Sequence, residues 1–433
     1  MQTPADLGCM GQRASQLGAV FMSNSGVIPV LPTPVAPSAR DMRLDFFRGL
    51  ALIFIFIDHI PGNIVADFTV RNFGFSDASE IFIFISGYAA GLVYMAATRR
   101  EGIVFASARV LRRVWQLYVA HLFLFIIFVA QVAWTSIEFD NPMYVEEMNI
   151  ASFLQEPHVA IIQAMLLKFK PVYMDILPLY IVLLMFLPVV LWLSSRSRLL
   201  AIAVSITLYV VVRYYHANLP GYPPGAVWYF NPLAWQLLFV AGAVLGGSSR
   251  QESFPIPRHR GLLAVAMIYL VFALVISLRW NFMDLGDNPF DNLLKAIFPF
   301  DKTNLSLWRL SHFLALAYAV IYFVRPENPF FKTRAAWPVI ICGQNSLHVF
   351  CLGVFLSFVG LIAIVEIDNS VPFHLLVNLI GVVAMIATAY LLDWYKTKER
   401  MPRRPLVGAA RADPLVAGRP VEKKRVFGGS SAE

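Results

Sequence analysis

Residues 42–65, MRLDFFRGLALIFIFIDHIPGNIV, decide the fold because they form an apolar run that is long enough to cross a membrane. The run also carries five ionisable residues, Arg43, Asp45, Arg48, Asp58 and His59. Each such group near the bilayer centre costs roughly 2.5–3.5 kcal/mol on insertion scales. On a helix, Asp45, Arg48 and His59 share one face, with Arg48 and His59 about 16 Å apart along the axis. These polar residues on one helix face predict that the helix has a function in addition to anchoring the chain in the membrane.

The composition of the whole chain places it in a membrane. Of its 433 residues, 58% are hydrophobic and 14% are charged, whereas soluble proteins average about 45–50% and about 25%. The net charge of +8 could indicate a nucleic-acid partner. Lys and Arg gather in alternate connections between apolar runs, however, as the positive-inside rule predicts for cytoplasmic loops. We therefore expect the lipid bilayer as partner, no nucleic acid, and both termini in the cytoplasm.

Apolar runs of suitable length predict an all-α polytopic membrane protein, a bundle of about ten transmembrane helices around a buried polar cavity. The ten runs are 44–65, 78–97, 114–135, 174–194, 198–213, 233–248, 261–279, 307–324, 337–363 and 372–394. We expect three regions: a disordered leader rich in Pro, Gly and Ser at 1–41, the membrane domain at 42–395, and a basic, disordered cytoplasmic tail at 396–433. Translation from Met42 is an alternative to Met1.

Several other spans contain polar residues that could reach the same cavity. They are Glu80 in the second run, Asp175 and Tyr180 in the fourth, Arg309 and His312 in the eighth, and Asn345 and His348 at a polar break in the ninth. A lone histidine on an apolar helix is more often structural than functional. The charges that share the face of His59 favour a functional role for it, and the partner of Asp58 stays open.

The chemistry of these residues is limited by the motifs that the chain lacks. There is no GxSxG elbow, P-loop or dinucleotide fingerprint. The histidines have no spacing typical of metal ligands, so we predict no metal. Two hypotheses remain. His59 could act as a general base that deprotonates a hydroxyl for acyl transfer, with Arg48 binding donor phosphates. Alternatively, the chain could be a proton-coupled transporter or glycan flippase, although the repeated halves common in such proteins are absent.

The motif-bearing segments resemble the OpgC family of the acyltransferase-3 superfamily. The spacing Arg48-x10-His59 is similar to the pattern of the superfamily's first helix, and FIFISG at 82–87 is similar to FFxxSG, with Ile83 replacing the second Phe. Further segments that resemble OpgC proteins are RLDFFRG at 43–49, DILPLY at 175–180, FNPLAWQLLFVAG at 230–242, KTNLSLWRLSHFLALAY at 302–318 and GQNSLHVF at 343–350. The likeness extends over essentially the whole membrane domain.

The resemblance implies an acyltransferase of the bacterial inner membrane that moves an acyl group, typically succinyl from succinyl-CoA, onto osmoregulated periplasmic glucans. His59 would then be the base, with Asp45 and Arg48 organising the donor side. From the expected shared cavity we add Asp58 to the catalytic group and Arg43, Asn345 and His348 to the acyl-CoA side. Asp175, Tyr180, Glu80, Arg309 and His312 are expected on the acceptor side. The acyl group, the glucan and a homo-oligomeric state stay open.

Overall fold

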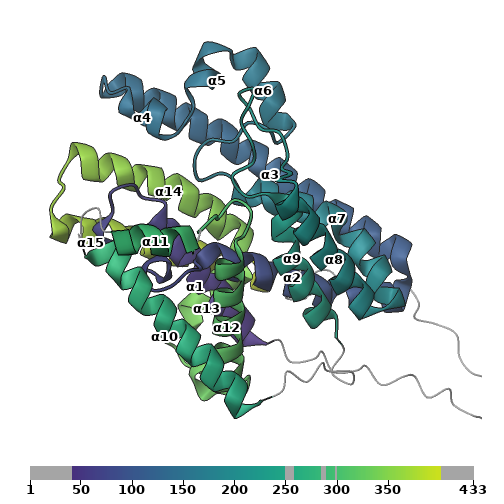
Figure 1. Ribbon diagram of the computed structural model, residues 1–433. Coiled ribbons are helices and arrows are strands. Elements are labelled where there is room, and N and C mark those ends of the chain that lie inside the picture. Colours follow the sequence, from purple (N-terminus) through teal and green to yellow (C-terminus); the bar gives the residue numbers. More distant parts are fainter. Residues whose placement is uncertain (1–40, 249–257, 284–288, 298–299, 401–433) are drawn as a thin grey trace, which may run out of the picture. The chain divides into compact units, whose positions relative to one another are not determined.

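The computed structural model describes residues 41–248, 258–283, 289–297 and 300–400 (Figure 1). The chain divides into two units, Met1–Asp41 and Met42–Glu433, and the description below concerns the second. Within the described ranges, every regular element is a helix. Six helices are long and apolar enough to cross a membrane: α2 (Ala78–Glu101), α3 (Ile103–Glu138), α7 (Ile176–Arg196), α10 (Arg260–Phe282), α14 (Ser346–Glu366) and α15 (Val371–Arg400). The chain is therefore a multi-pass membrane protein, as predicted.

The remaining predicted spans are shorter helices. They are α1 (Met42–Asp58), α8 (Arg198–Tyr214), α9 (Pro232–Gly247) and α12 (Leu307–Phe323). A helix of 17 residues such as α1 rises about 25 Å, less than the hydrocarbon core of about 30 Å. The total of about ten spans thus stays a prediction. The ninth run is broken at Asn345, between α13 (Trp337–Gln344) and α14, where the sequence has its polar break.

Two glycine pairs bring α2 and α9 into backbone contact. A Cβ atom added at Gly91 would lie 1.9 Å from the carbonyl oxygen of Ala243, and one added at Gly246 would lie 2.0 Å from that of Tyr88. Gly87 and Gly242 are equally crowded. Small residues spaced by four allow helices to approach this closely inside a membrane. The contact fixes α2, whose first turn contributes to the site described below.

Helix α1 packs against α2, α13 and α14 (Figure 1). Leu52, Ile55 and Phe56 are buried in the main hydrophobic core. At its other end, a Cβ atom at Gly343 of α13 would lie 1.9 Å from the carbonyl oxygen of Asp45. The polar helix predicted from the sequence is thus held along its length by neighbouring helices, which fixes the positions of both its ends.

The long connections contain short helices. Residues between α3 and α7 form α4 (Met143–Glu147), α5 (Ala151–Gln155) and α6 (Pro157–Met165), and α11 (Pro289–Ile297) precedes α12. The described residues also include the 3-10 helices η1 (Ile64–Phe68), η2 (Val70–Asn72) and η3 (Pro329–Lys332). Helix α6 packs on α3, where the Tyr118 hydroxyl donates to the Met165 carbonyl over 2.8 Å. The connection around α6 is therefore an ordered part of the fold.

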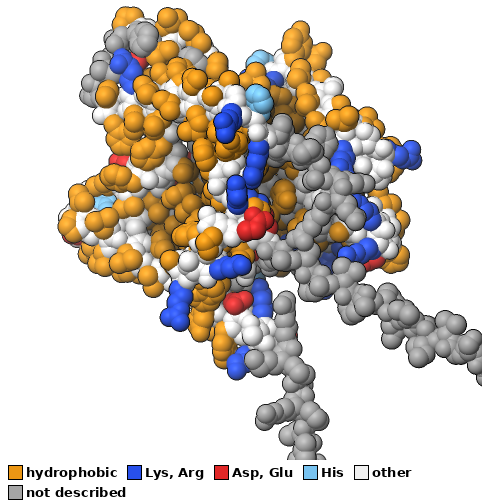
Figure 2. Space-filling view, turned by 90° about the horizontal axis from the view of Figure 1, so that it is seen from below, with side chains coloured by type: hydrophobic (Ala, Val, Ile, Leu, Met, Phe, Trp, Pro, Cys, Tyr) orange, Lys and Arg blue, Asp and Glu red, His pale blue; other side chains and the backbone are white. Residues whose placement is uncertain are grey.

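The surface agrees with a lipid environment. Hydrophobic side chains cover much of the face in Figure 2, and Lys and Arg side chains lie between them in the centre, the lower part and the right-hand side. Large apolar side chains such as Trp115 and Ile137 are exposed along α3, as expected for helix faces in contact with lipid. Helix α15 continues to Arg400, past the expected boundary at 395. Residues 1–40 of the leader expected at 1–41, and residues 401–433 of the tail expected at 396–433, lie outside the described residues.

Candidate functional site

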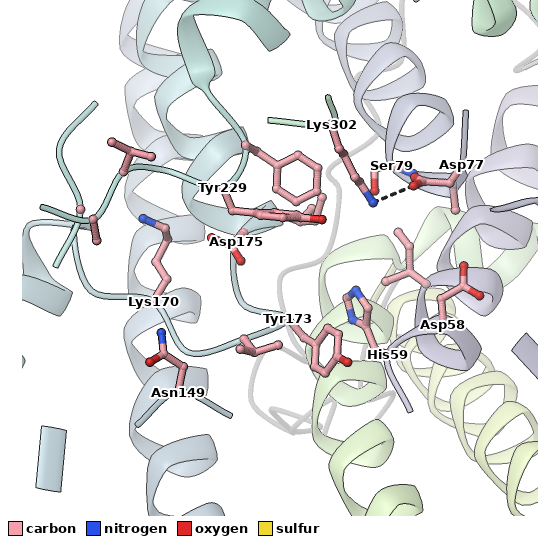
Figure 3. A pocket seen from close by; sticks show the side chains of 18 of the residues that line it. Asp58, His59, Asp77, Ser79, Asn149, Lys170, Tyr173, Asp175, Tyr229 and Lys302 are labelled. Carbon is pink, nitrogen blue, oxygen red and sulfur yellow. Dashed lines mark hydrogen bonds and ion pairs between the residues drawn. The ribbon is translucent and has the colours of Figure 1, made fainter. Parts of the chain in front are cut away.

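A pocket of about 500 Å³ lies at the C-terminal end of α1 (Figure 3). Its walls come from the end of α1, the start of α2, and the connections before α7, α9 and α12. This volume is within the range of about 300–1,000 Å³ that is usual for ligand pockets. The lining combines carboxylates, cations and aromatic rings, a mixture suited to a polar ligand with many hydroxyl groups.

His59 faces this pocket directly after the last residue of α1 (Figure 3). Its backbone N–H donates to the Ile55 carbonyl over 3.0 Å, which continues the helical register. The imidazole stacks on Tyr173, with ring centroids 4.5 Å apart and planes inclined by 29°. Its Nδ1 is buried and has no hydrogen-bond partner among the described residues. The ring is thus held by its packing against Tyr173 at the lining of the pocket.

Asp58 also lines the pocket, but its carboxylate is engaged elsewhere. The Thr69 hydroxyl donates to Asp58 Oδ1 over 2.6 Å, and Arg71 Nε lies 3.9 Å from the same oxygen. Both partners belong to the connection between α1 and α2, which the helical pattern could not place. In the described part of the chain, Asp58 therefore forms no hydrogen-bonded pair with His59.

A network of ion pairs begins at Asp77, immediately before α2. Asp77 Oδ1 accepts from the Ser79 N–H over 2.8 Å, while its own N–H donates to Glu80 Oε2 over 2.9 Å, which makes a capping box. Asp77 Oδ2 accepts from Lys302 Nζ over 2.6 Å and from Arg309 Nη2 over 3.0 Å. Burial alone would raise the pKa of Asp77, but the cations of Lys302 and Arg309 hold it well below its ordinary value of 3.8. The pocket wall therefore carries a fixed negative charge beside Lys302.

The opposite wall carries Lys170 and Asp175. Lys170 Nζ lies 3.9 Å from the centroid of the Trp228 ring and donates to the Leu167 carbonyl over 3.2 Å. Burial lowers the pKa of Lys170 to about 8, partly offset by the charge of Asp175. Burial likewise raises the pKa of Asp175 to about 6, against the opposing effect of Lys170. The Asp175 carboxylate has no hydrogen bond to other described side chains, so it can accept bonds from a ligand (Figure 3).

Four residues expected on the acceptor side lie outside the lining of this pocket. Glu80 is fully buried and bonded to Arg309, whose Nε donates to Glu80 Oε1 over 2.7 Å. His312 Nδ1 lies 2.8 Å from the Ser76 hydroxyl, and the Tyr180 ring packs against other aromatic side chains. Glu80, Arg309 and His312 surround the capped start of α2, so they support the pocket wall. Asp77, Lys302 and Tyr173, which the sequence did not single out, form the wall itself.

The donor-side residues on α1 lie at the other end of the helix. Asp45 is buried, and Gln344 Nε2 donates to its Oδ2 over 3.3 Å. Arg48 Nη2 donates to the Ile85 carbonyl of α2 over 3.1 Å, and Arg43 donates to a carbonyl just after α12 over 2.6 Å. Asp45 thus contacts the end of α13 and Arg48 contacts α2, and neither residue lines the pocket of His59.

Asn345, at that break, links three helices. Its side chain donates to the Ile341 carbonyl over 3.0 Å and to the Ala389 carbonyl of α15 over 3.3 Å. Its Oδ1 accepts from Lys396 Nζ over 2.5 Å. His348, one turn further along α14, is exposed. Asp45 on α1 and Asn345 at the start of α14 therefore both lie beside the end of α13. In the described residues, no group of three or more His, Cys, Asp or Glu side chains could hold a metal ion.

The fold and the pocket define a multi-pass helical membrane protein with a pocket that polar and aromatic side chains line at one end of α1. A family model described as OpgC protein matches residues 40–397, and the chain belongs to this family. This membership, together with the apolar helices, fits a membrane acyltransferase-type role. No curated protein and no solved structure matches the chain.

Proposed function

We propose that this protein is an inner-membrane O-acyltransferase that moves an acyl group, succinyl in the simplest case, from cytoplasmic acyl-CoA to hydroxyl groups of periplasmic glucans. The observation that carries the proposal is the position of His59, whose imidazole stacks on Tyr173 and lines a polar pocket at the end of α1. Both termini are cytoplasmic in this proposal, so the pocket opens towards the periplasm. The family membership supports the reaction type.

The donor enters from the opposite end of α1. Arg48 is suited to phosphate groups because a guanidinium offers several donors in a fixed plane. Asp45 and Asn345, with Arg43 and His348 further out, line this cytoplasmic side in the proposal. Arg48 precedes His59 by eleven positions, about 16 Å of helix. An acyl-CoA held by its phosphates at Arg48 must therefore extend its pantetheine arm along α1 to present the thioester to His59.

The acceptor occupies the pocket and is oriented by its hydroxyl groups. Asp175 accepts hydrogen bonds from sugar hydroxyls, and the exposed ring of Tyr229 on the rim offers an apolar face to a sugar ring. In the reaction, His59 removes the proton of one hydroxyl while its oxygen attacks the thioester carbonyl carbon. The tetrahedral intermediate then collapses, the carbon–sulfur bond breaks, and the CoA thiolate takes the proton from the His59 imidazolium. The products are an O-acyl ester and free CoA.

The test uses purified full-length protein with succinyl-CoA and a periplasmic glucan. We expect free CoA to appear and the glucan mass to increase by one succinyl group per transfer. His59→Ala should abolish both signals without loss of folded protein, while His158→Ala, at an exposed position on α6, should keep them. Arg48→Ala should chiefly raise the KM for acyl-CoA. Flux of glucan across liposomes without CoA release would overturn the proposal in favour of a transporter or flippase.

A further inference from the structure

Lys302 extends into the pocket from a backbone segment that is firmly held. The indole Nε1 of Trp235 donates to the Lys302 carbonyl over 3.0 Å, and the N–H of Asn231 donates to the Thr303 carbonyl over 3.0 Å. Both partners belong to the start of α9, which packs against α2 through the glycine contacts described above. The Lys302 side chain therefore starts from a fixed point.

The ammonium group of Lys302 is held in place, but not all of its N–H donors are used. Its Nζ donates to Asp77 Oδ2 over 2.6 Å, and the side chains of the pair are 25% and 12% exposed. Asp77 is its single hydrogen-bond partner among the described residues, whereas an ammonium group has three N–H donors. The Phe230 ring lies 5.3 Å away. Two N–H donors therefore remain for a group that enters the pocket.

Lys302 and His59 face the same cavity, as Figure 3 shows. Burial lowers the pKa of the His59 imidazole most, and the positive charge of Lys302 makes the next largest contribution. Two other cations of the pocket lining, Lys170 and Arg71, are held differently. Lys170 donates to carbonyl groups of its own connection, and the side chain of Arg71 is 45% exposed. Of these three cations, Lys302 combines the shortest ion pair with a position on the same cavity as His59.

We propose that Lys302 is a catalytic residue that stabilises the oxyanion of the tetrahedral intermediate; this inference rests on the proposed acyl transfer. When the hydroxyl oxygen attacks, the thioester carbonyl oxygen gains a negative charge, and the free N–H donors of Lys302 bind it. Asp77 holds the ammonium in place before the reaction, so little reorganisation is needed at the transition state. On collapse, the electron pair returns to the carbonyl and the thiolate leaves. Lys302 gains and loses no proton in this step.

The first test replaces the cation with a neutral side chain of similar length. Lys302→Met should lower kcat by about 100- to 1,000-fold, the usual effect of removing one oxyanion donor, with KM for both substrates within about twofold of wild type. Lys302→Arg should recover a measurable part of the loss. Arg279→Met is the control. It also removes the cation of an ion pair, in which Arg279 Nε lies 2.8 Å from Asp291 Oδ1, but this pair lies outside the pocket. The Arg279→Met variant should therefore keep the wild-type kcat. A Lys302→Met enzyme within threefold of wild-type kcat would overturn the inference.

A second variant separates catalysis from charge balance. In Lys302→Met, the buried Asp77 carboxylate loses one of its two cationic partners and keeps Arg309, and this loss of a partner can destabilise the fold. The double variant Lys302→Met with Asp77→Asn removes both charges of the pair. We expect kcat of the double variant to stay as low as that of the single variant. Recovery to wild type would show that Lys302 merely neutralises Asp77.

The pH profile gives an independent reading of the same inference. Loss of the neighbouring cation makes His59 easier to protonate. The acid limb of the kcat/KM profile should therefore move to higher pH in Lys302→Met. An acid limb at the wild-type position would contradict the proximity of Lys302 and His59. If wild-type protein transfers no acyl group, the proposed function itself fails. If wild type is active, His59→Ala is inactive and Lys302→Met is fully active, the role of Lys302 alone fails.

Discussion

Tyr173 offers a way to measure how precisely the base must be held. Its ring stacks on His59 at 4.5 Å, and its backbone has φ = +70°, a conformation that costs a residue other than glycine roughly 1–3 kcal/mol. An aromatic pair contributes about 0.5–1.5 kcal/mol beyond burial. If that contact keeps the imidazole in its productive position, its loss corresponds to about a 2- to 13-fold fall in kcat.

Three substitutions separate the ring from the backbone strain. Tyr173→Phe keeps the ring and should keep kcat. Tyr173→Ala loses the ring and retains the strain, whereas Tyr173→Gly loses the ring and relieves the strain. We therefore expect Ala and Gly to share the same reduced kcat, with the Gly variant more stable than the Ala variant by about 1 kcal/mol.

The assay follows CoA release with a thiol reagent in detergent, alongside thermal unfolding of each variant. The reasoning is refuted if kcat changes in parallel with the stability of the variants, so that Tyr173→Gly recovers the activity that Tyr173→Ala loses. It is equally refuted if Tyr173→Phe is as impaired as Tyr173→Ala, because the hydroxyl and not the ring would then matter.

Three further predictions concern other parts of the fold. A Cβ atom at Gly91 would lie 1.9 Å from the Ala243 carbonyl oxygen, so the two helices would have to separate by about 1.5 Å to give an ordinary contact of 3.4 Å. Gly91→Leu should therefore destabilise the protein by about 1–3 kcal/mol. An unchanged unfolding temperature would contradict this packing. Because the pKa of Asp175 is about 6, its carboxylate loses its proton between pH 5 and 7, and acceptor affinity should rise over that range in wild type but not in Asp175→Asn. The unfolded carboxyl, with its ordinary pKa of 3.8, releases its proton first, so this group should also make stability fall as pH rises from about 4 to 6. Thr69→Val removes the 2.6 Å bond to Asp58 and should cost about 1.5–3 kcal/mol; Thr69→Ser, which keeps the hydroxyl, should cost less in the same unfolding assay.

The helical architecture could be read from the sequence because apolar runs in a membrane have few alternatives to a helix. All ten predicted runs overlap a helix, and the polar break near Asn345 falls where α13 ends and α14 begins. The short helices of the connections could not be predicted in this way. Helix α6, for instance, is defined by its packing on α3, a tertiary contact that no local pattern contains.

The site was predictable only in part, for a similar reason. His59 and Asp175 were singled out because a charge or an imidazole in an apolar run is costly, and both line the pocket. Asp77 and Lys302 lie in polar connections, where charged residues are ordinary and give no signal. They meet because α9 and α2 pack together, although 225 positions separate them in the sequence.

Arg48 on α1 and His59 directly after it are joined by one continuous helical segment, which fixes the distance between them. A thicker or thinner bilayer can change the tilt of a membrane helix, yet it cannot change the separation of two residues that one continuous helical segment joins. If Arg48 holds the donor and His59 activates the acceptor, the reach required of the acyl donor is therefore set by the protein and not by the lipid. Acyl transfer should then proceed at the same rate in membranes of different hydrocarbon thickness, provided that the fold is retained.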